Sequence, residues 1–152
     1  MRILGIDPGL RSTGWGVLSI NLGCLQHIAN GAIRPNPRDS DADRLTMIYQ
    51  SLSSVIADMQ PDRAMIEEIF VAKSARSALR LGMARGVCVL ACGAAQIKVS
   101  EISARAVKKA VVGTGTASKE QIQDMVTRLL QVNAFNADAA DALAIAIAGS
   151  ND

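Results

Sequence analysis

The stretch ILGIDPG, residues 3–9, is a short apolar run that ends in an aspartate, a proline and a glycine. Proline fixes one position of a turn and glycine accepts a positive φ at the next, so a tight turn follows this strand. Two further runs, residues 13–20 and 24–33, have the composition and partial alternation of strands. Residues 2–33 therefore predict a three-stranded antiparallel meander with Asp7 at its first turn.

Helices and strands alternate after the meander. Apolar spacing and capping residues first predict an amphipathic helix that starts at Asp39 or Ser40 and ends at Gln60, a buried strand at 64–67, a helix from 74 or 75 to about 95, and a strand at 98–102. A short helix capped by Ser103 and a loop at 112–116 follow. The chain then forms a helix that is opened by Ser118 with Gln121 and ends near 132, and a last helix from near Asp138 to Gly149. This order predicts an α/β fold with a mixed sheet, and we expect residues 1–152 to form a single domain.

The composition is that of a globular protein. The chain has 152 residues, of which 49% are hydrophobic and 20% charged. Residues 1 and 2 lead directly into a strand and no uninterrupted apolar run reaches roughly 18 residues, so we expect neither a signal peptide nor a membrane span. The cysteines, Cys24, Cys88 and Cys92, are odd in number and lack CxxC spacing, which favours a reducing compartment and a cytoplasmic protein.

Basic residues are concentrated in one part of the chain. The formal net charge is only +2, but residues 63–119 contain ten Lys and Arg against three Glu. A basic surface of this kind suits an enzyme that acts on a polyanion. Ordinary solvated side chains on helices explain part of the same pattern.

Four carboxylates lie at the edges of apolar elements: Asp7, Glu67, Asp138 and Asp141. An ionised acid beside a core is costly unless a cation or a proton compensates it, so their recurrence predicts a shared divalent metal. Mg²⁺ and Mn²⁺ prefer such oxygen ligands, and His27, the only histidine, excludes a His-rich zinc site. In the alternative interpretation, Asp138 and Asp141 are an N-cap and an N3 acid of the last helix, and Asp7 only starts a turn.

Two phosphate-binding motifs are not matched. Asp7 is followed by a turn and another strand, whereas a dinucleotide-binding glycine loop must lead into a helix. The glycine-containing loop at 112–116 lacks the Gly-Lys-Ser/Thr of a P-loop.

Five segments in order, residues 4–9, 66–75, 81–86, 107–115 and 137–144, together resemble the RuvC family of bacterial Holliday-junction resolvases. The resemblance implies an RNase H-like fold and a homodimer that resolves four-way DNA junctions by paired, symmetric, metal-dependent nicks in recombination and DNA repair. It also implies the branch-migration proteins RuvA and RuvB as partners. Many relatives continue beyond the last helix with a polar or basic tail. Residues 1–152 stop soon after that helix, so we do not expect a DNA contact from such a tail here.

The resemblance places the family's catalytic acids and metal ligands on Asp7, Glu67, Asp138 and Asp141. Two metal ions about 4 Å apart, Mg²⁺ with Mn²⁺ able to substitute, supply both the activated water and the stabilisation of the leaving oxygen. Glu68 occupies a position that need not be acidic in the family. Neighbouring side chains of a strand point to opposite faces, so only one of Glu67 and Glu68 joins Asp7.

The resemblance also assigns DNA contacts. Phe70 lies in the segment that contacts the junction, where an exposed aromatic can stack on an opened base, although a core position would equally suit a phenylalanine. Lys108 and Lys119 are basic residues beside the active site, and Lys119 is the candidate to neutralise developing negative charge in catalysis; as a helix-start lysine it is otherwise simply solvated. Lys73, Arg76 and Arg80 either line DNA phosphates or solvate a helix.

Small residues on the helix at 75–95 indicate a close contact. Gly82 and Gly86 are costly inside a helix, so we expect a packing reason for them, either a homodimer contact or the chain's own sheet. Two other function classes compete with the junction endonuclease. An ATP-binding domain of the actin and sugar-kinase type needs two such domains, and a silent nucleic-acid-binding module would not gain from four acids that repel DNA.

Overall fold

The computed structural model describes residues 1–69 and 74–151 of the chain. Its sheet contains β1 (Arg2–Asp7), β2 (Thr13–Asn21), β3 (Cys24–Ile33), β4 (Arg63–Glu67) and β5 (Lys98–Ile102), in the order β3-β2-β1-β4-β5. β1, β2 and β3 pair antiparallel, whereas β4 pairs parallel with both β1 and β5. The predicted meander and the mixed sheet are therefore confirmed.

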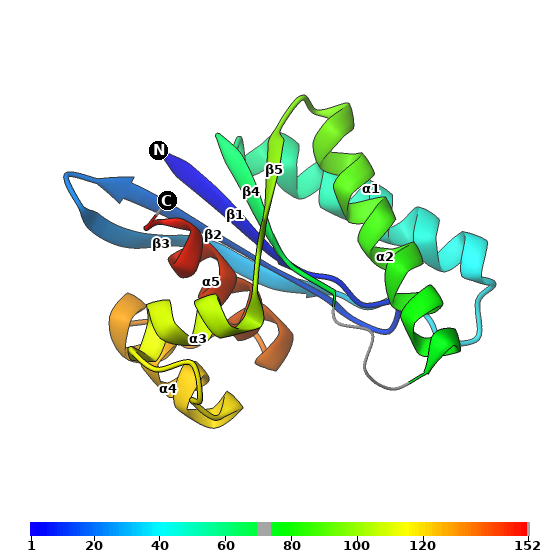
Figure 1. Cartoon of the computed structure of the whole chain (residues 1–152). Coiled ribbons are helices and arrows are strands. Elements are labelled where there is room, and N and C mark those ends of the chain that lie inside the picture. The colour runs from blue at the N-terminus through cyan, green and yellow to red at the C-terminus, as the bar shows by residue number, and fades with distance from the viewer. Residues whose placement is uncertain (70–73, 152) are drawn as a thin grey trace.

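Helices cover both faces of this sheet. α1 (Asp41–Met59) and α2 (Ala75–Ala94) lie on one face, and α3 (Ala104–Val112), α4 (Lys119–Leu130) and α5 (Ala137–Gly149) lie on the other (Figure 1). Each face has its own apolar core: Ile48, Ile66 and Cys88 belong to one, and Met65, Val126 and Leu143 to the other. Ile66 and Met65 are neighbours on β4, so the alternation of a strand supplies both cores.

The helix ends follow local side-chain chemistry. Ser40, Ser74 and Ser103 cap α1, α2 and α3, and Ser118 forms the predicted capping box with Gln121 at the start of α4. α4 ends at Leu130, two residues before the predicted end, because Gln131 takes a left-handed φ of 53°. The cap of α5 is Asn136, so the interpretation of Asp138 as an N-cap is wrong.

α5 lies directly on β1 and β2. Almost all of this helix is buried, and most of its residues are alanine. A Cβ built at Gly5 would overlap the carbonyl oxygen of Ala142 and lie 2.7 Å from the backbone nitrogen of Ala146. Gly16, the strand partner of Gly5, faces the side chain of Leu143 in the same way. Bare backbone on the strands therefore allows the helix backbone to approach closely.

One face of α2 has no cover among the described residues. By length and composition alone, α2 is apolar enough to cross a membrane, and 22% of its most apolar window is buried. The helix also carries Arg76, Arg80 and Arg85, which are charged side chains that a membrane core disfavours.

Gly5→Ala is expected to lower the free energy of unfolding by about 3 kcal/mol, because the new Cβ overlaps backbone atoms of α5 that cannot turn aside. Urea denaturation of the variant measures this loss. The control is Gly93→Ala in α2, where an added Cβ meets no atom within 4 Å. That variant should be more stable than the parent by up to about 1 kcal/mol, because alanine favours a helix. An unchanged stability of Gly5→Ala would contradict the close packing of α5.

Candidate active site

Three elements bring the predicted acids to one edge of the sheet. Asp7 ends β1 and Glu67 ends β4, and the parallel pairing of Ile6 with Ile66 places these two ends side by side. Asp138 and Asp141 lie in the first turns of α5. Single carboxylate oxygens of Asp7, Asp138 and Asp141 lie within 4.8 Å of one another. Residues separated by more than 130 positions in the sequence thus form one cluster.

The start of α5 is fixed by two features. Asn136 accepts a hydrogen bond of 2.9 Å from the backbone nitrogen of Ala139, which sets the residue at which the helix begins. Gly14 is the strand partner of Asp7, and a Cβ at Gly14 would overlap the carbonyl oxygen of Asp138. Any larger residue at this position would push the first turn of α5, with its acids, away from Asp7.

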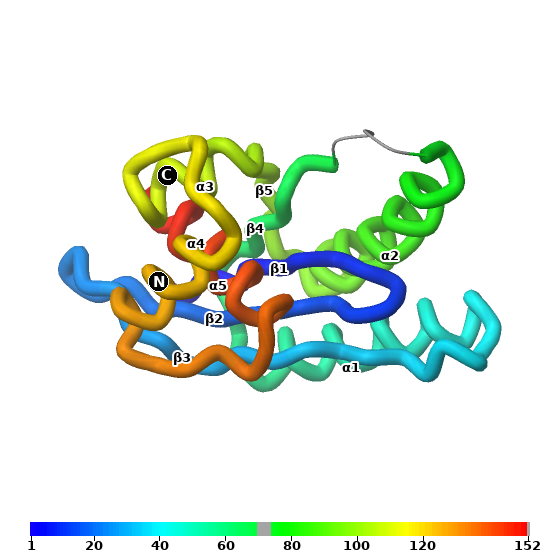
Figure 2. The backbone as a smooth tube through the Cα atoms, turned by 90° about the horizontal axis from the view of Figure 1, so that it is seen from below, coloured from blue at the N-terminus to red at the C-terminus, as the bar shows by residue number. Residues whose placement is uncertain are grey.

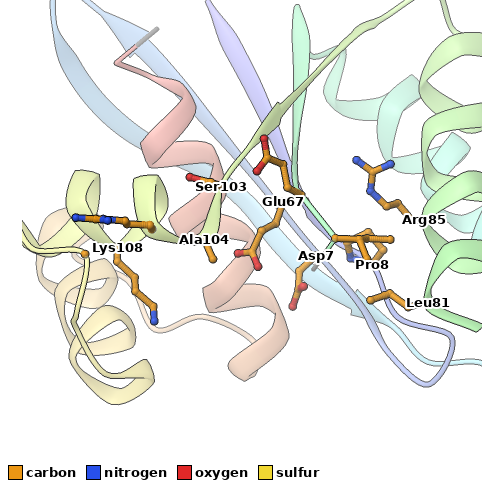
Figure 3. A pocket seen from close by; sticks show the side chains of 12 residues that line it. Asp7, Pro8, Glu67, Leu81, Arg85, Ser103, Ala104 and Lys108 are labelled. Carbon is orange, nitrogen blue, oxygen red and sulfur yellow. The ribbon is translucent and has the colours of Figure 1, made fainter. Parts of the chain in front are cut away.

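Glu67 lies beside this triad of carboxylates and shares its cavity. A cavity of about 330 Å³ is lined by Glu67, Asp7 and Asp141 together with Lys108 and Lys119. A second cavity, of about 560 Å³, also contains Asp7, Glu67 and Lys108 and continues toward Leu81 and Arg85 of α2 (Figure 3). Glu68 is exposed and lines only the larger of these two cavities.

Two of the acids, Asp7 and Glu67, have a raised pKa. Burial raises the pKa of Asp7 to about 7, and the neighbouring charges of Asp141, Asp138 and Glu67 add to this effect. Burial also raises the pKa of Glu67, followed by the charge of Asp141, while Lys108 and Lys119 lower it. The positive charges of the described residues therefore do not fully compensate the negative charge of the cluster.

Lys119 supplies part of that charge. Its Nζ lies 2.7 Å from Oδ2 of Asp141, and this hydrogen bond raises the pKa of Lys119. The lysine side chain is 59% exposed, so it reaches the cluster from the solvent side. Lys108 of α3 lines the same cavity without an ion pair among the described residues.

The predicted DNA contacts have different outcomes. Phe70 and Lys73 lie outside the described residues. Arg76 is exposed in the first turn of α2. Arg80 forms a two-pronged ion pair with Asp41 of α1, at 3.2 and 3.3 Å, so a free solvated arginine is the wrong description. The partner lies on another helix, which the local sequence does not indicate.

The structure adds residues that sequence reasoning missed. Arg85 and Arg105 line the larger cavity beside Asp7, and Arg85 is held at 2.7 Å by Glu101 of β5. Gly14 has a direct role in admitting α5. A glycine in an otherwise apolar strand is a recognised signal of close backbone approach, but the sequence does not say which element approaches.

The donor set fits a divalent cation. Three carboxylates whose oxygens converge, with burial that raises the pKa of Asp7 to about 7, are the hard oxygen ligands that Mg²⁺ and Mn²⁺ prefer. Asp7, Asp138 and Asp141 would hold the cation directly, and Glu67 lies close enough to share the cavity.

Comparisons with known proteins agree on one family. Residues 3–149 match the family model described as crossover junction endodeoxyribonuclease RuvC. The chain is 48% identical to the RuvC protein of Caulobacter vibrioides over 99% of its own length and 89% of the relative, and 49% identical to that of Paramagnetospirillum magneticum over 97% and 89%. It also matches Thermus thermophilus RuvC, solved in complex with a Holliday junction substrate, with a TM-score of 0.92 and 27% identity over 99% of this chain and 93% of that one.

A more distant likeness bears on the fold alone. The yeast mitochondrial Holliday junction resolvase Ydc2 is 14% identical, with a TM-score of 0.69 over 96% of this chain and 76% of that one. With the RuvC match, it confirms the expected RNase H-like α/β fold.

Asp7→Asn is expected to stabilise the metal-free protein at pH 8 by several degrees in melting temperature and to have little effect near pH 4. The pKa of Asp7 is about 7 in the folded protein, against 3.8 for an ordinary aspartate. The free-energy cost of ionising Asp7 in the folded state therefore grows from about pH 4 to about pH 7 and is constant above that. Melting curves in the presence of a chelator measure the difference. The same offset between variant and parent at both pH values would show that repulsion within the cluster is not its cause.

Proposed function

The chain belongs to the RuvC family of crossover junction endodeoxyribonucleases, and on that premise we propose that it resolves four-way DNA junctions by divalent-metal-dependent hydrolysis. The observation that carries this proposal is the convergence of Asp7, Asp138 and Asp141 at the end of β1. Basic residues around the acids, among them Lys108 and Lys119, provide the charge that a DNA strand requires.

The residues divide the chemistry between them. Bound Mg²⁺, or Mn²⁺ in its place, supplies an activated water and stabilises charge on the leaving oxygen, with two ions per site as the expected number. Asp7, Asp138 and Asp141 would hold the cation in a fixed place, because rigid elements carry these three side chains. Glu67 lines the same cavity from the adjacent strand. Lys119 exchanges Asp141 for the phosphate that enters, which places its charge where negative charge develops.

The same premise extends to DNA contacts away from the acids. Phe70 follows β4 and is assigned to stacking on an unpaired base at the junction centre. Lys73, Arg76 and Lys108 are assigned to phosphates. We also propose that the protein makes its paired cuts in recombination and DNA repair, and that it acts in the cytoplasm. In this role it would cooperate with the branch-migration proteins RuvA and RuvB.

Symmetric cutting needs two active sites related by a two-fold axis, and α2 offers the surface for a homodimer. Leu79 and Leu90 are 71% and 59% exposed, and Met83 is 38% exposed. At 100° per residue these three side chains fall on one stripe with Gly82, Gly86 and Gly93. Added Cβ atoms at all three glycines meet no atom within 4 Å in the described residues, so the alternative that they pack on the chain's own sheet is wrong.

The buried residues of α2 lie on the opposite side of the helix. Ala84, Cys88, Ala91 and Cys92 pack toward α1 and the sheet. The exposed stripe is therefore apolar without serving the chain's own core. We assign it to a second copy, whose stripe would meet this one across the two-fold axis.

Asp141→Asn is expected to slow junction cleavage roughly 100-fold or more, at least the loss caused by changing a group that only supports a metal ligand. Binding to the junction should persist, because the change removes no phosphate contact. Asp7→Asn, Glu67→Gln and Asp138→Asn should behave alike. Single-turnover cleavage of a four-way junction, with linear duplex and RNA–DNA hybrid for comparison, measures the effect. Glu68→Gln is the matched control and should cut at nearly the parental rate; parental cleavage by Asp141→Asn would remove that residue from the site.

Gly86→Leu is expected to give a folded monomer that no longer makes paired nicks. The new side chain has open space within one chain and gains helix propensity, so folding is not impaired, but it blocks a close approach of two α2 helices. Sedimentation equilibrium measures the association, and Gly82→Leu should behave in the same way. Thr127→Leu on the exposed side of α4 controls for an added surface leucine. A stable dimer of Gly86→Leu with normal paired cleavage would place the interface elsewhere.

A further inference from the structure

A third cavity adjoins the acids at Asp138, and Glu67 is not among the residues that line it. It measures about 660 Å³ and is lined by Asp138, by the turn between β1 and β2, by Arg34 after β3, and by Arg80 and Leu81 of α2. The turn contributes Gly9, Leu10, Arg11 and Ser12. Figure 2 shows this turn reaching from the end of β1 toward α2. Asp138 is the one residue of this lining that takes part in the proposed reaction.

The wall formed by the turn is held rigidly from inside the protein. Thr13 is completely buried, and its hydroxyl donates to the carbonyl oxygen of Gly9 at 2.8 Å while accepting from the Gly9 nitrogen at 3.2 Å. Arg44 of α1 is 8% exposed and donates to the carbonyl oxygen of Leu10 at 3.0 Å. A buried arginine is costly, so its use to hold a surface turn indicates that the turn must keep one conformation.

The charges in the cavity favour an anion. Arg80 is occupied by Asp41, but among the described residues neither Arg11 nor Arg34 forms an ion pair with a carboxylate. The guanidinium carbon of Arg34 lies 5.9 Å from the ring centre of Phe135, which restrains that side chain. With Asp138 committed to the cation, two free guanidinium groups remain beside the metal ligands.

We propose that Arg11 and Arg34 bind a backbone phosphate of the cleaved strand, one of the two that flank the scissile phosphate. This site rests on the proposed function and extends it, because the scissile phosphate must lie at Asp7, Asp138 and Asp141. A strand that crosses those acids must continue on both sides of them. The cavity at Asp138 offers one such continuation, because Glu67 and Lys108 line other cavities and not this one. Arginine matches this role, because its planar fork donates two hydrogen bonds to a phosphate.

The contact sets the position of the strand and leaves the reacting atoms to the acids. Arg11 is fixed by the turn that Thr13 and Arg44 hold, and Arg34 is restrained by Phe135. A phosphate gripped at this point prevents the strand from sliding along the metal ligands. Arg11 and Arg34 are therefore binding and positioning residues for the junction strand.

The test removes one phosphate charge at a time. After the parental cleavage site has been mapped, junctions are made with a neutral methylphosphonate at either flanking phosphate, and metal-free binding is measured for each variant. The parent should lose affinity roughly tenfold at one of the two positions, the size of a charge-assisted hydrogen bond. Arg11→Ala and Arg34→Ala should each bind the unmodified junction roughly tenfold more weakly than the parent does. Because the contact is already lost, placing the methylphosphonate at that position should lower the affinity of these variants by less than about twofold.

Arg38→Ala is the matched control, because Arg38 is an exposed arginine four positions from Arg34 that does not line the cavity. It should keep the full tenfold sensitivity of the parent. Melting temperatures within about two degrees of the parent establish that Arg11→Ala and Arg34→Ala are folded, as expected for surface substitutions. If both arginine variants lost as much affinity as the parent on the methylphosphonate junctions, at both positions, the phosphate site would be overturned. The proposed function would remain in place. A parent that neither binds nor cuts junctions would overturn both.

Discussion

The close approach of α5 to the middle of the sheet is the constraint on which the other features depend. The acids of α5 can meet Asp7 only if the helix backbone nearly touches β1 and β2, and an ordinary side chain at Gly5 or Gly14 would prevent this. The alanines of α5 meet the same requirement from the helix side. A helix that is buried on nearly every side also cannot drift along the sheet, so Asp138 and Asp141 are carried by one of the most firmly held elements of the protein.

This rigidity has a cost, since it forces like charges together. Burial raises the pKa of Asp7 to about 7, and the neighbouring acids add to the effect, so Asp7 resists ionisation near neutral pH when no cation is bound. Lys119 offsets part of the repulsion through Asp141 but remains largely exposed and able to leave. An arrangement that is unfavourable without a cation is suited to binding one, because the elements that hold the acids prevent them from relaxing apart.

Local patterns predicted most of the fold, and the site residues that depend on distant contacts were not predicted. The apolar run before Asp7 and the Ser118 and Gln121 capping box were informative because turns and caps are decided by a few neighbouring residues. The role of Asp138 as a cap was wrong because Asn136, two residues earlier, caps the helix and leaves Asp138 inside the first turn. The pairing of Arg80 with Asp41 joins residues 39 positions apart and leaves no local pattern. The four acids were found because an acid at the end of an apolar run is unusual wherever it occurs.

α2 contributes both to the cavities at the acids and to the surface assigned to the homodimer. Its Leu81 lines both the cavity that contains Asp7 and Glu67 and the cavity that contains Asp138. Leu79 and Leu90, on a different side of the helix, belong to the exposed stripe assigned to a second copy. A helix is stiff over this length, so a two-fold contact along the stripe would fix the distance and direction between the two sets of acids. The strand path past Leu81 and the symmetry axis would then belong to one rigid element. Paired cuts would follow from this geometry, without any need for communication between the two active sites.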